Sequence, residues 1–331
     1  IGQPSWQAFT NITDAKNFAL EVGYPVLVRP SYVLSGAAMK VVWSQTELKK
    51  FVNEATIVSP DHPVVITKFM LDALEVDVDG VCDGENVAIG AIVEHIDSAG
   101  VHSGDAMMCI PPWRLSNKII ENITDSTTRI AKEFNIRGPF NLQFLVKNEQ
   151  AYVIELNIRA SRSMPFVSKF VKVNIISLAA QAILGKKISN IPQEMWANTG
   201  MHGIKVPQFS FMQLEGADIV LGVEMQSTGE AACFGNSFYD ALSKGLTSVG
   251  YNLPKTGSAL VTIGGVENRE KLLHTSALLK SLGFKILATE TTAEFFAEKL
   301  GDVTVVHKIS EPDRKPNISD LLHEKKIDFI I

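Results

Sequence analysis

The chain has 331 residues, 46% of them hydrophobic and 20% charged, with a formal net charge of -5. These values are typical of a soluble globular enzyme of two or three domains. The negative net charge and the absence of a basic run argue against non-specific binding to nucleic acid. The sequence contains no apolar run long enough to span a bilayer and no signal peptide. It begins with Ile1 and ends in the uncapped apolar run Asp328–Ile331, so we expect a piece of a longer polypeptide.

The first third of the chain alternates predicted helices and strands. We expect a helix over 11–22, capped by Thr13 and Asp14 and ended by Gly23, and a second helix over 46–56. The apolar runs predict strands over 26–30, 40–43 and 63–70.

A loop rich in Gly, Ser and Ala over 31–39 joins the first two of these strands. Such a loop allows backbone N–H groups to approach phosphates, although a plain hairpin turn has the same composition. Arg29 precedes the loop on an otherwise apolar strand, where an unpaired charge is costly. We therefore favour a phosphate-binding loop.

Residues 75–84 alternate acidic and apolar side chains, which predicts a strand with one polar face. Glu75 at its start is a candidate acceptor for ribose hydroxyls, and a solvated strand acid is the alternative. A strand over 87–95 leads to a loop in which Gly100 and Gly104 bracket Val-His-Ser, so its backbone can reach a ligand. His102 in this loop is interpreted as an orienting or solvated group rather than a base.

A helix over 115–134 precedes a hairpin with strands at 140–146 and 152–158. On the second strand, Glu155, Asn157 and Arg159 share one face, and Ile154, Leu156 and Ile158 share the other. Gln143 joins the polar face only if the connecting loop has an odd number of residues, and we predict the loop 148–150.

The polar face of this hairpin predicts a phosphoryl-transfer site. Mg²⁺ prefers carboxylate and amide oxygens, which Gln143, Glu155 and Asn157 would supply. Arg159 and Arg162 would contact phosphoryl oxygens in two-pronged fashion. A metal and arginines at one point supply the charge neutralisation that phosphoryl transfer needs. The alternative is a sheet edge with a solvated ion pair.

The rest of the first part is less regular. We expect helices over 173–184 and 238–249, an extended segment over 205–211, a compact polar stretch over 224–230 and a linker over 254–257. The three cysteines, Cys82, Cys109 and Cys233, lie far apart and not at the spacing of metal ligands. They are interpreted as buried reduced thiols.

The last part changes rhythm. Strands over 258–263, 284–289, 303–307 and 327–330 alternate with helices over 268–282, 292–300 and 318–324. This order predicts a parallel, doubly wound sheet, which binds ligands at the carboxyl ends of its strands. Thr262, Thr289 and Thr292 lie there, beside a helix N-terminus suited to an anion. Because no set of acid, base and nucleophile occurs, we expect a regulatory site.

Long stretches of the chain resemble the C-terminal part of the large, synthetase portion of carbamoyl-phosphate synthetase. They are Val28–Gly36, Ala99–Asp105, Glu155–Arg162, Pro165–Lys169 and Glu224–Glu230. The resemblance covers nearly the whole chain and implies an α/β architecture, an α+β ATP-grasp unit followed by a doubly wound methylglyoxal-synthase-like domain. It implies that residues 1–190 form the second ATP-grasp unit, which lacks its pre-grasp region. Residues 191–253 would be a C-terminal extension of that unit, and residues 254–331 a truncated allosteric domain.

The resemblance implies ATP-dependent phosphorylation of carbamate to carbamoyl phosphate with Mg²⁺ or Mn²⁺. The implied catalytic residues are Asn157, Arg159 and Arg162, and the implied metal ligands are Gln143, Glu155 and Asn157. Contacts to ATP are implied for Arg29, Met39, Lys68, Glu75, Gly100, Val101, His102, Ser103, Gln143 and Glu155. Contacts to an effector are implied for Thr262, Arg269, Thr289, Thr292 and Lys308.

The family also implies carbamate or bicarbonate as substrate, a glutaminase and a first ATP-grasp unit in the same or a partner chain, and an oligomer. No nucleic-acid or membrane partner is expected. The stretch 205–211 resembles the cytoplasmic, multifunctional pyrimidine branch, and a uridine nucleotide could place its phosphate on Lys308. The stretch 288–292 resembles the urea-cycle branch of the mitochondrial matrix, which N-acetylglutamate activates. We favour the pyrimidine branch.

Two further alternatives differ in class. Another ATP-grasp ligase, such as a biotin carboxylase, would share the metal strand, but the terminal doubly wound domain and the stretch 165–169 argue against it. A regulatory module with an inactive grasp site is the second alternative, and the complete set of metal ligands and arginines argues against that.

Overall fold

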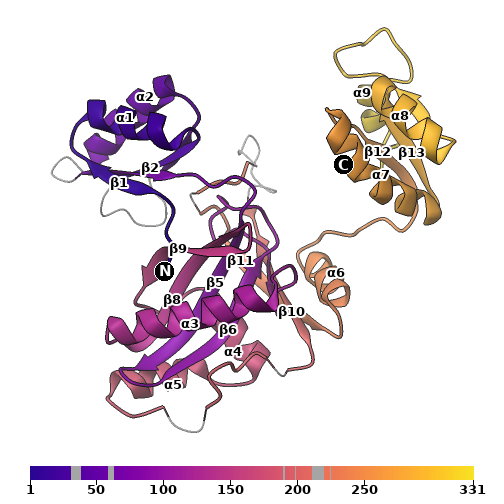
Figure 1. Ribbon diagram of the computed structural model, residues 1–331. Helices are drawn as coiled ribbons and strands as arrows, with labels where there is room; N and C mark the ends of the chain where they lie inside the picture. The colour runs from indigo at the N-terminus through magenta and orange to yellow at the C-terminus, as the bar shows by residue number, and fades with distance from the viewer. Residues whose placement is uncertain (31–38, 59–62, 189–190, 198, 211–219, 224) are drawn as a thin grey trace. The chain divides into compact units, whose positions relative to one another are not determined.

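The computed structural model describes residues 1–30, 39–58, 63–188, 191–197, 199–210, 220–223 and 225–331. The chain divides into two compact units, Ile1–Tyr251 and Asn252–Ile331 (Figure 1). Residues 191–251 thus belong with the first unit, and the finer division at residue 190 stays a prediction. Most of the predicted phosphate loop, residues 31–38, lies outside the described residues, as do Phe211 and Glu224.

The first unit begins with a small antiparallel sheet of strand order β1-β4-β2-β3. Its elements are β1 (Trp6–Phe9), α1 (Ile12–Val22), β2 (Val26–Pro30), β3 (Lys40–Val42), α2 (Gln45–Val58) and β4 (Val64–Lys68). The two helices cover one face of this sheet (Figure 1), where Val26, Val28 and Ile66 form a buried core. The opposite face is therefore left for a ligand.

The first helix is capped by a residue other than those predicted. Asn11 has extended backbone angles, and its side-chain oxygen accepts the Asp14 N–H at 2.9 Å. The prediction of Thr13 and Asp14 as the cap is wrong, because the helix begins at Ile12 and Asn is as good an N-cap as Thr or Asp.

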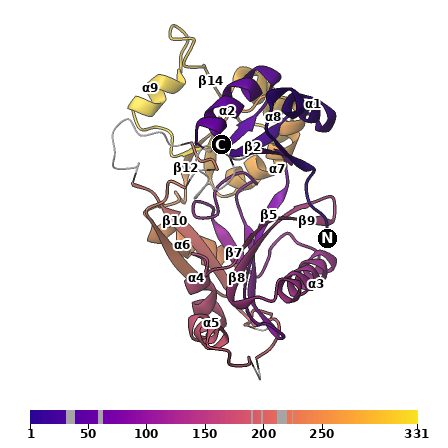
Figure 2. The same ribbon diagram turned by 90° about the vertical axis from the view of Figure 1, so that its left-hand side faces the viewer.

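A larger antiparallel sheet of order β11-β10-β7-β6-β5-β8-β9 follows. Its strands are β5 (Leu74–Asp83), β6 (Val87–His95), β7 (Met108–Ile110), β8 (Arg137–Lys147), β9 (Gln150–Asn157), β10 (His202–Gln208) and β11 (Gly229–Gly235). The core on one face holds Val76 and Val78 of β5 together with residues of α3 (Asn117–Glu133), α4 (Met164–Val171) and α5 (Ile175–Ile183) (Figure 2). The intervening acids Glu75, Asp77 and Asp79 take the other face.

Three elements of the large sheet and its helices were not predicted, namely β7, β11 and α4. The strand β11 is built of Gly, Glu, Ala, Cys and Phe, mostly poor strand formers, and its pairing with β10 along its whole length outweighs that propensity. The short helix α4 begins with Met164-Pro165 and buries Phe166 and Phe170 against the sheet. The helix α6 (Phe238–Ser248) packs on β10 and β11.

The β8–β9 hairpin reaches the predicted polar face by an unpredicted route. Its loop has two residues, Asn148 and Glu149, both with positive φ, so the prediction of an odd loop is wrong. The register then shifts between Phe144, which pairs with Val153, and Gln143, which pairs with Glu155. One extra residue in β9, Ile154, therefore supplies the odd count as a β-bulge.

The second unit is the predicted parallel sheet, of order β14-β13-β12-β15. Its elements are β12 (Gly257–Val261), α7 (Val266–Ser281), β13 (Phe284–Thr289), α8 (Glu290–Leu300), β14 (Thr304–Val306), α9 (Ile318–His323) and β15 (Phe329–Ile330). The strand order places β13 and β14 on one side of β12 and β15 on the other, which confirms the doubly wound arrangement.

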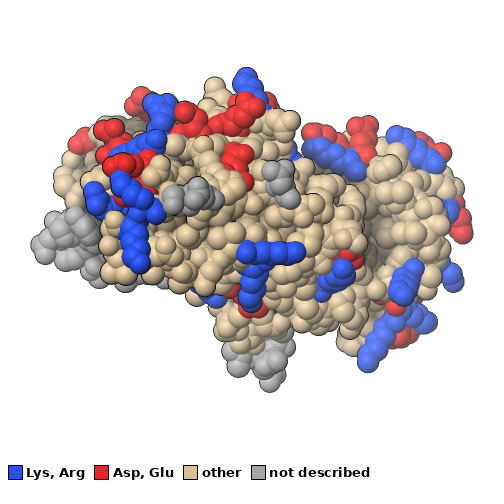
Figure 3. All heavy atoms as spheres, turned by 90° about the horizontal axis from the view of Figure 1, so that it is seen from below, with Lys and Arg blue, Asp and Glu red and all other residues tan. Residues whose placement is uncertain are grey.

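In the described residues, no single helix is long and apolar enough to cross a membrane. The pair α4 and α5, bent by 114°, passes by length and composition only, and both helices contribute to the core of the large sheet. On the face that Figure 3 shows, basic and acidic side chains lie interspersed. Cys82 and Cys109 are buried and Cys233 is partly exposed, and all three are free thiols.

Candidate nucleotide-binding site

A cavity of about 660 Å³ in the first unit is lined by both sheets and the loops beside them. All residues predicted for the nucleotide, the metal and the transferred phosphoryl group line it. They are Arg29, Met39, Lys68, Glu75, Gly100, Val101, His102, Ser103, Gln143, Glu155, Asn157, Arg159 and Arg162.

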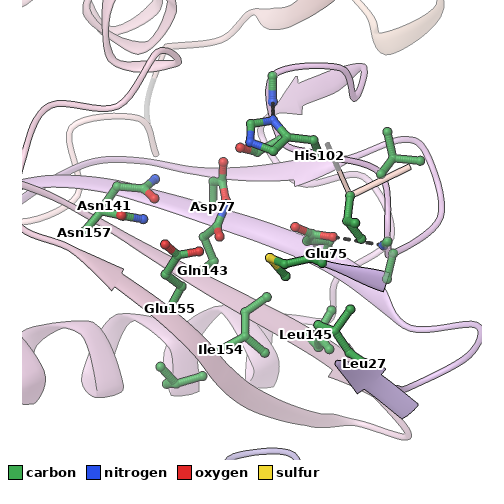
Figure 4. A pocket seen from close by; sticks show the side chains of 18 of the residues that line it. Leu27, Glu75, Asp77, His102, Asn141, Gln143, Leu145, Ile154, Glu155 and Asn157 are labelled. Carbon is green, nitrogen blue, oxygen red and sulfur yellow. Dashed lines mark hydrogen bonds between the residues drawn. The ribbon is translucent and has the colours of Figure 1, made fainter. Parts of the chain in front are cut away.

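The two ends of this cavity differ in chemistry (Figure 4). Leu27, Leu145 and Ile154 lie together at one end, and Gln143, Glu155 and Asn157 point toward one another at the other. The prediction that Ile154 faces away from Glu155 is wrong, because the bulge brings Ile154 to the cavity side. An apolar end joined to a polar end suits a ligand with a flat base and a charged tail.

The polar end has the donors that Mg²⁺ or Mn²⁺ prefers. Asn157 lies opposite Asn141, two positions from the Gln143–Glu155 pair. Among the described residues, no group of three or more His, Cys, Asp or Glu side chains could hold a metal by itself. One carboxylate and two amide oxygens fit a hard cation whose remaining positions are filled by phosphate oxygens and water.

Asp77 orients Gln143, the first of these candidate ligands. Its Oδ1 accepts the Nε2 amide of Gln143 at 3.0 Å, and both side chains are buried. Because the NH₂ group is held by Asp77, the carbonyl oxygen of Gln143 is turned away from that carboxylate. In the same region, Arg159 Nη2 donates to Asn157 Oδ1 at 3.3 Å.

A buried histidine links the row of acids on β5. His95 Nε2 lies 3.5 Å from Asp77 Oδ2, and its Nδ1 lies 4.0 Å from Glu75 Oε1. Burial alone lowers the pKa of His95, but Glu75 and Asp77 together raise it above its ordinary value. Burial raises the pKa of Glu75, and the charge of His95 opposes that increase. Glu75 also accepts the Gly100 N–H at 3.4 Å.

The predicted backbone loop at 100–103 is fixed from two sides. His102 Nδ1 accepts the Gly104 N–H at 3.0 Å, which is the orienting role expected for His102, and burial lowers its pKa. Lys205, 2% exposed, donates to the carbonyls of Ser103 at 3.0 Å and Gly104 at 3.2 Å. Burial lowers the pKa of Lys205 to about 8.

Lys68 lines the cavity with its ammonium engaged elsewhere. Its Nζ donates to the carbonyls of Gly23 at 2.8 Å and Tyr24 at 3.3 Å, in the turn before β2. In this arrangement the ammonium braces the small sheet, and the stem of the side chain contributes to the cavity wall.

Asp79, the last acid of the row, lies behind the cavity. Its carboxylate accepts Ser161 Oγ at 2.5 Å, Ser163 Oγ at 2.6 Å and Asn141 Nδ2 at 3.1 Å. Burial raises the pKa of Asp79 to about 6, and the hydroxyl donors oppose that increase.

In the second unit, four of the five predicted effector residues meet at the carboxyl end of β12. The hydroxyls of Thr262 and Thr289 lie 3.0 Å apart. Thr292 Oγ1 and Arg269 Nε each donate to the carbonyl of Ile263 at 3.4 Å. Lys308 follows β14 at the same edge of the sheet. The hydrogen bond from Arg314 lowers the pKa of Glu290, and the charges of Arg314, His307 and Lys308 add to this effect.

Sequence reasoning missed several residues of the first unit. Asp77, Ser163 and Lys205 line the cavity. Behind them, His95 contacts Asp77, and Asp79 accepts a hydrogen bond from Ser163. A signal existed for three of them. The alternation at 75–79 marks Asp77 and Asp79, and a lysine inside an apolar strand marks Lys205 by the argument used for Arg29. The contacts of Asp79 with Ser161 and Ser163 join segments about eighty residues apart and left no local signal.

The fold and the cavity define an ATP-grasp ATP-binding unit followed by a small parallel-sheet domain. A biotin carboxylase from Campylobacter jejuni, solved as a complex with β,γ-ATP, matches 74% of this chain and 61% of its own, with TM-score 0.61 and 18% identity. The biotin carboxylase domain of a Hydrogenobacter thermophilus 2-oxoglutarate carboxylase, solved with MgADP and bicarbonate, matches 74% and 62%, with TM-score 0.60 and 15% identity. At these identities the likeness shows the fold alone.

The chain belongs to the carbamoyl-phosphate synthase family. The family model for the carbamoyl-phosphate synthase L chain, ATP-binding domain, matches residues 3–191, and the model for the MGS-like domain matches residues 271–331. The multifunctional protein CAD of Squalus acanthias is 45% identical over all of this chain, and the multifunctional protein URA2 of Saccharomyces cerevisiae is 46% identical over 90% of it. The mitochondrial carbamoyl-phosphate synthase [ammonia] of Aquarana catesbeiana is 45% identical over all of it.

The chain spans 15%, 13% and 22% of the lengths of these relatives, respectively. The family assignment confirms the ATP-binding domain with an MGS-like domain behind it, and it sets the biotin carboxylase alternative aside.

Proposed function

We propose that the first unit transfers the γ-phosphoryl group of ATP to carbamate and so forms carbamoyl phosphate. The observation that supports this proposal is that three side chains with oxygen atoms suited to a metal, Gln143, Glu155 and Asn157, line one cavity together with Arg159 and Arg162. A carbamate oxygen forms a bond to the γ-phosphorus while the bond from that phosphorus to the β,γ-bridging oxygen breaks. ADP leaves with that oxygen, and no covalent bond to the protein is needed.

Each group of residues has a distinct part in this reaction. Gln143, Glu155 and Asn157 would hold Mg²⁺ or Mn²⁺, which neutralises phosphate charge when bound. Arg159 and Arg162 face the transferred phosphoryl group and carbamate and stabilise the charge that develops there. Glu75 accepts hydrogen bonds from the ribose hydroxyls. The rest of the nucleotide is held by the backbone of residues 100–103 and by Arg29, Met39 and Lys68.

The chain would work as part of a longer synthetase. The proposed partners are a glutaminase and a first ATP-grasp unit, in the same or a partner chain, within an oligomer. The likeness to multifunctional proteins supports the pyrimidine branch and a cytoplasmic location. The ammonia-dependent mitochondrial relative keeps the matrix form as the alternative. In the second unit, Thr262, Arg269, Thr289, Thr292 and Lys308 would bind a uridine nucleotide in the first case and N-acetylglutamate in the second.

The back reaction on the full-length enzyme tests the proposal. ATP formation from carbamoyl phosphate and MgADP is measured for the wild type and for Arg159→Met. We expect a loss of about 10²–10³-fold, as for removal of one donor to a developing charge. The matched control is Arg129→Met, since Arg129 is an exposed arginine on α3 that pairs with Asp125. A wild-type enzyme that binds MgADP and forms no ATP would contradict the proposed reaction.

The same assay distinguishes the branches. It is repeated with UTP and with N-acetylglutamate. A rate that responds to UTP supports the pyrimidine branch, and a rate that responds to N-acetylglutamate supports the urea-cycle branch.

A further inference from the structure

Asp79 is a fully buried carboxylate that does not line the cavity. Its exposed fraction is 0%, and it lies on β5 two residues after Asp77. An ionised carboxylate removed from water is costly unless its oxygens are satisfied by donors. Both oxygens of Asp79 accept hydrogen bonds, and these donors offset the cost of burying the carboxylate.

Two of these donors come from the segment that carries the phosphoryl-transfer arginines. Ser161 Oγ and Ser163 Oγ lie on either side of Arg162 in sequence, and they donate to different oxygens of Asp79 at 2.5 and 2.6 Å. The two hydroxyls are also 2.9 Å apart. Hydrogen bonds to an ionised acceptor are short and strong, so the carboxylate holds the segment 158–163 at two points.

These two hydrogen bonds matter because the segment lies between two regular elements. The strand β9 ends at Asn157 and the helix α4 begins at Met164. Between them, the side chain of Ile158 is 61% exposed, and Arg159 and Ala160 are also exposed. Ser161 adds a contact on the helix side, since its Oγ accepts the Met164 N–H at 3.1 Å. Asp79 thus ties the start of α4 and the arginine segment to the middle of the large sheet.

We propose that Asp79 is a positioning residue for phosphoryl transfer, which fixes Arg159 and Arg162 through Ser161 and Ser163. This inference rests on the proposed function of the same cavity. A misplacement of about 1 Å at a reacting centre can cost on the order of 10²-fold in rate. The residues at the apolar end of the cavity, Leu27, Leu145 and Ile154, lie outside this segment. We therefore expect the effect on the catalytic step and not on nucleotide affinity.

The test uses the full-length enzyme and the double variant Ser161→Ala/Ser163→Ala, which leaves Asp79 in place. The rate of ATP formation from carbamoyl phosphate and MgADP gives kcat, and the dissociation constant of MgADP is measured directly. We expect kcat to fall about 30–100-fold, with the MgADP dissociation constant unchanged within about threefold. The matched control is Ser168→Ala on α4, a serine whose hydroxyl donates to the Val173 carbonyl at 2.5 Å, away from the cavity. It should keep the wild-type kcat.

Two further variants separate positioning from folding. Asp79→Asn preserves the shape of the side chain and should lower kcat in the same way. Ser161→Thr/Ser163→Thr keeps both hydroxyls and should restore most of the rate. Unchanged kcat in the double alanine variant would overturn the proposal, and so would a parallel loss of kcat, MgADP binding and thermal stability.

A readout without carbamoyl chemistry distinguishes this proposal from the proposed function. Aluminium fluoride with MgADP mimics a phosphoryl group in transfer, and its binding depends on the arginines. If the wild type binds this complex but forms no ATP from carbamoyl phosphate, the proposed reaction fails. Weaker binding of the complex by the double alanine variant would then still support positioning, and equal binding would refute it.

Discussion

The amide nitrogen of Gln143 donates to Oδ1 of Asp77 at 3.0 Å, and this contact decides which atom of Gln143 is free to meet a cation. Both residues lie on adjacent strands, directly opposite each other in the register of β5 and β8. The carbonyl oxygen of Gln143 is therefore presented to the side where Glu155 lies.

Asp77→Asn should weaken the proposed metal site without removing one of its proposed ligands. An amide at position 77 can donate as well as accept, so the Gln143 amide is no longer held in one orientation. Mutation of a residue that orients a metal ligand typically lowers metal affinity about 10–100-fold. We expect the Mg²⁺ or Mn²⁺ concentration for half-maximal ATP formation to rise by that factor. Asp125→Asn, an exposed change on α3, serves as control, and an unchanged metal dependence in Asp77→Asn would contradict the role of Asp77.

The sequence was enough to predict that Gln143 and Glu155 share a face, but not the loop length and bulge that bring them there. Alternation along each strand indicates which side chains share a face, because the period is local. The relation between the two strands depends on loop length and bulges. Here a two-residue loop and a bulge at Ile154 together give the facing that an odd loop would have given. Sequence periodicity carries no signal for one inserted residue inside an apolar strand.

Contacts between distant segments were the second limit. The parallel sheet of the second unit was predictable nearly strand by strand, since each β-α step is a local pattern. The contact of Asp79 with Ser161 depends on packing between β5 and the segment after β9, and nothing near either residue indicates it. The strand β11 was missed for the same reason, because its pairing with β10 outweighs its composition.

Lys205 should give the protein a distinctive dependence of stability on pH. Burial lowers its folded-state pKa to about 8, below the ordinary value of 10.5, so the unfolded chain binds more protons between these values. Stability therefore rises with pH across that window, by up to about 3 kcal/mol for this group. Compared with Lys205→Met, the wild type should gain unfolding free energy from pH 8 to 10.5 and keep a constant offset below pH 8. Urea unfolding at each pH measures this, and parallel curves throughout would refute it.

Trp6 should contribute to binding of the nucleotide base. It pairs with Thr67 across the small sheet, and Thr67 pairs with Leu27, so all three side chains share the face away from the buried core and line the cavity. An aromatic ring at such a wall contributes about 0.5–1.5 kcal/mol, so Trp6→Ala should weaken MgATP binding about 2–10-fold.

A probe without a base checks this interpretation of Trp6. Magnesium tripolyphosphate should bind Trp6→Ala and the wild type equally well. Trp43→Ala, at a tryptophan that is 57% exposed and follows β3, should leave MgATP affinity unchanged. Equal losses for MgATP and tripolyphosphate would mean that Trp6 acts on the whole site and not on the base.

Asp83 should stabilise the fold at neutral pH and lose that effect in acid. Its carboxylate accepts N–H groups from Glu85 at 2.9 Å, Asn86 at 2.8 Å and Ile188 at 2.6 Å, which ties the turn after β5 to a segment about a hundred residues away. Burial raises its pKa, but these donors outweigh burial and hold the pKa well below its usual range. A depressed pKa means that the stabilisation is complete above the unfolded value near pH 4 and fades as pH falls toward the folded value.

Asp83→Ala should therefore lower the free energy of unfolding by about 2–3 kcal/mol at pH 7, because it leaves buried N–H groups without an acceptor. The difference from the wild type should shrink as pH falls from 5 to 3. Glu85→Ala, which removes an exposed acid paired with Lys187, should change stability by less than about 0.5 kcal/mol. Urea unfolding at each pH measures both variants. Because Asp83 lies outside the cavity, MgADP affinity should stay at the wild-type value in the folded variant, and a large loss of that affinity would contradict a purely structural role.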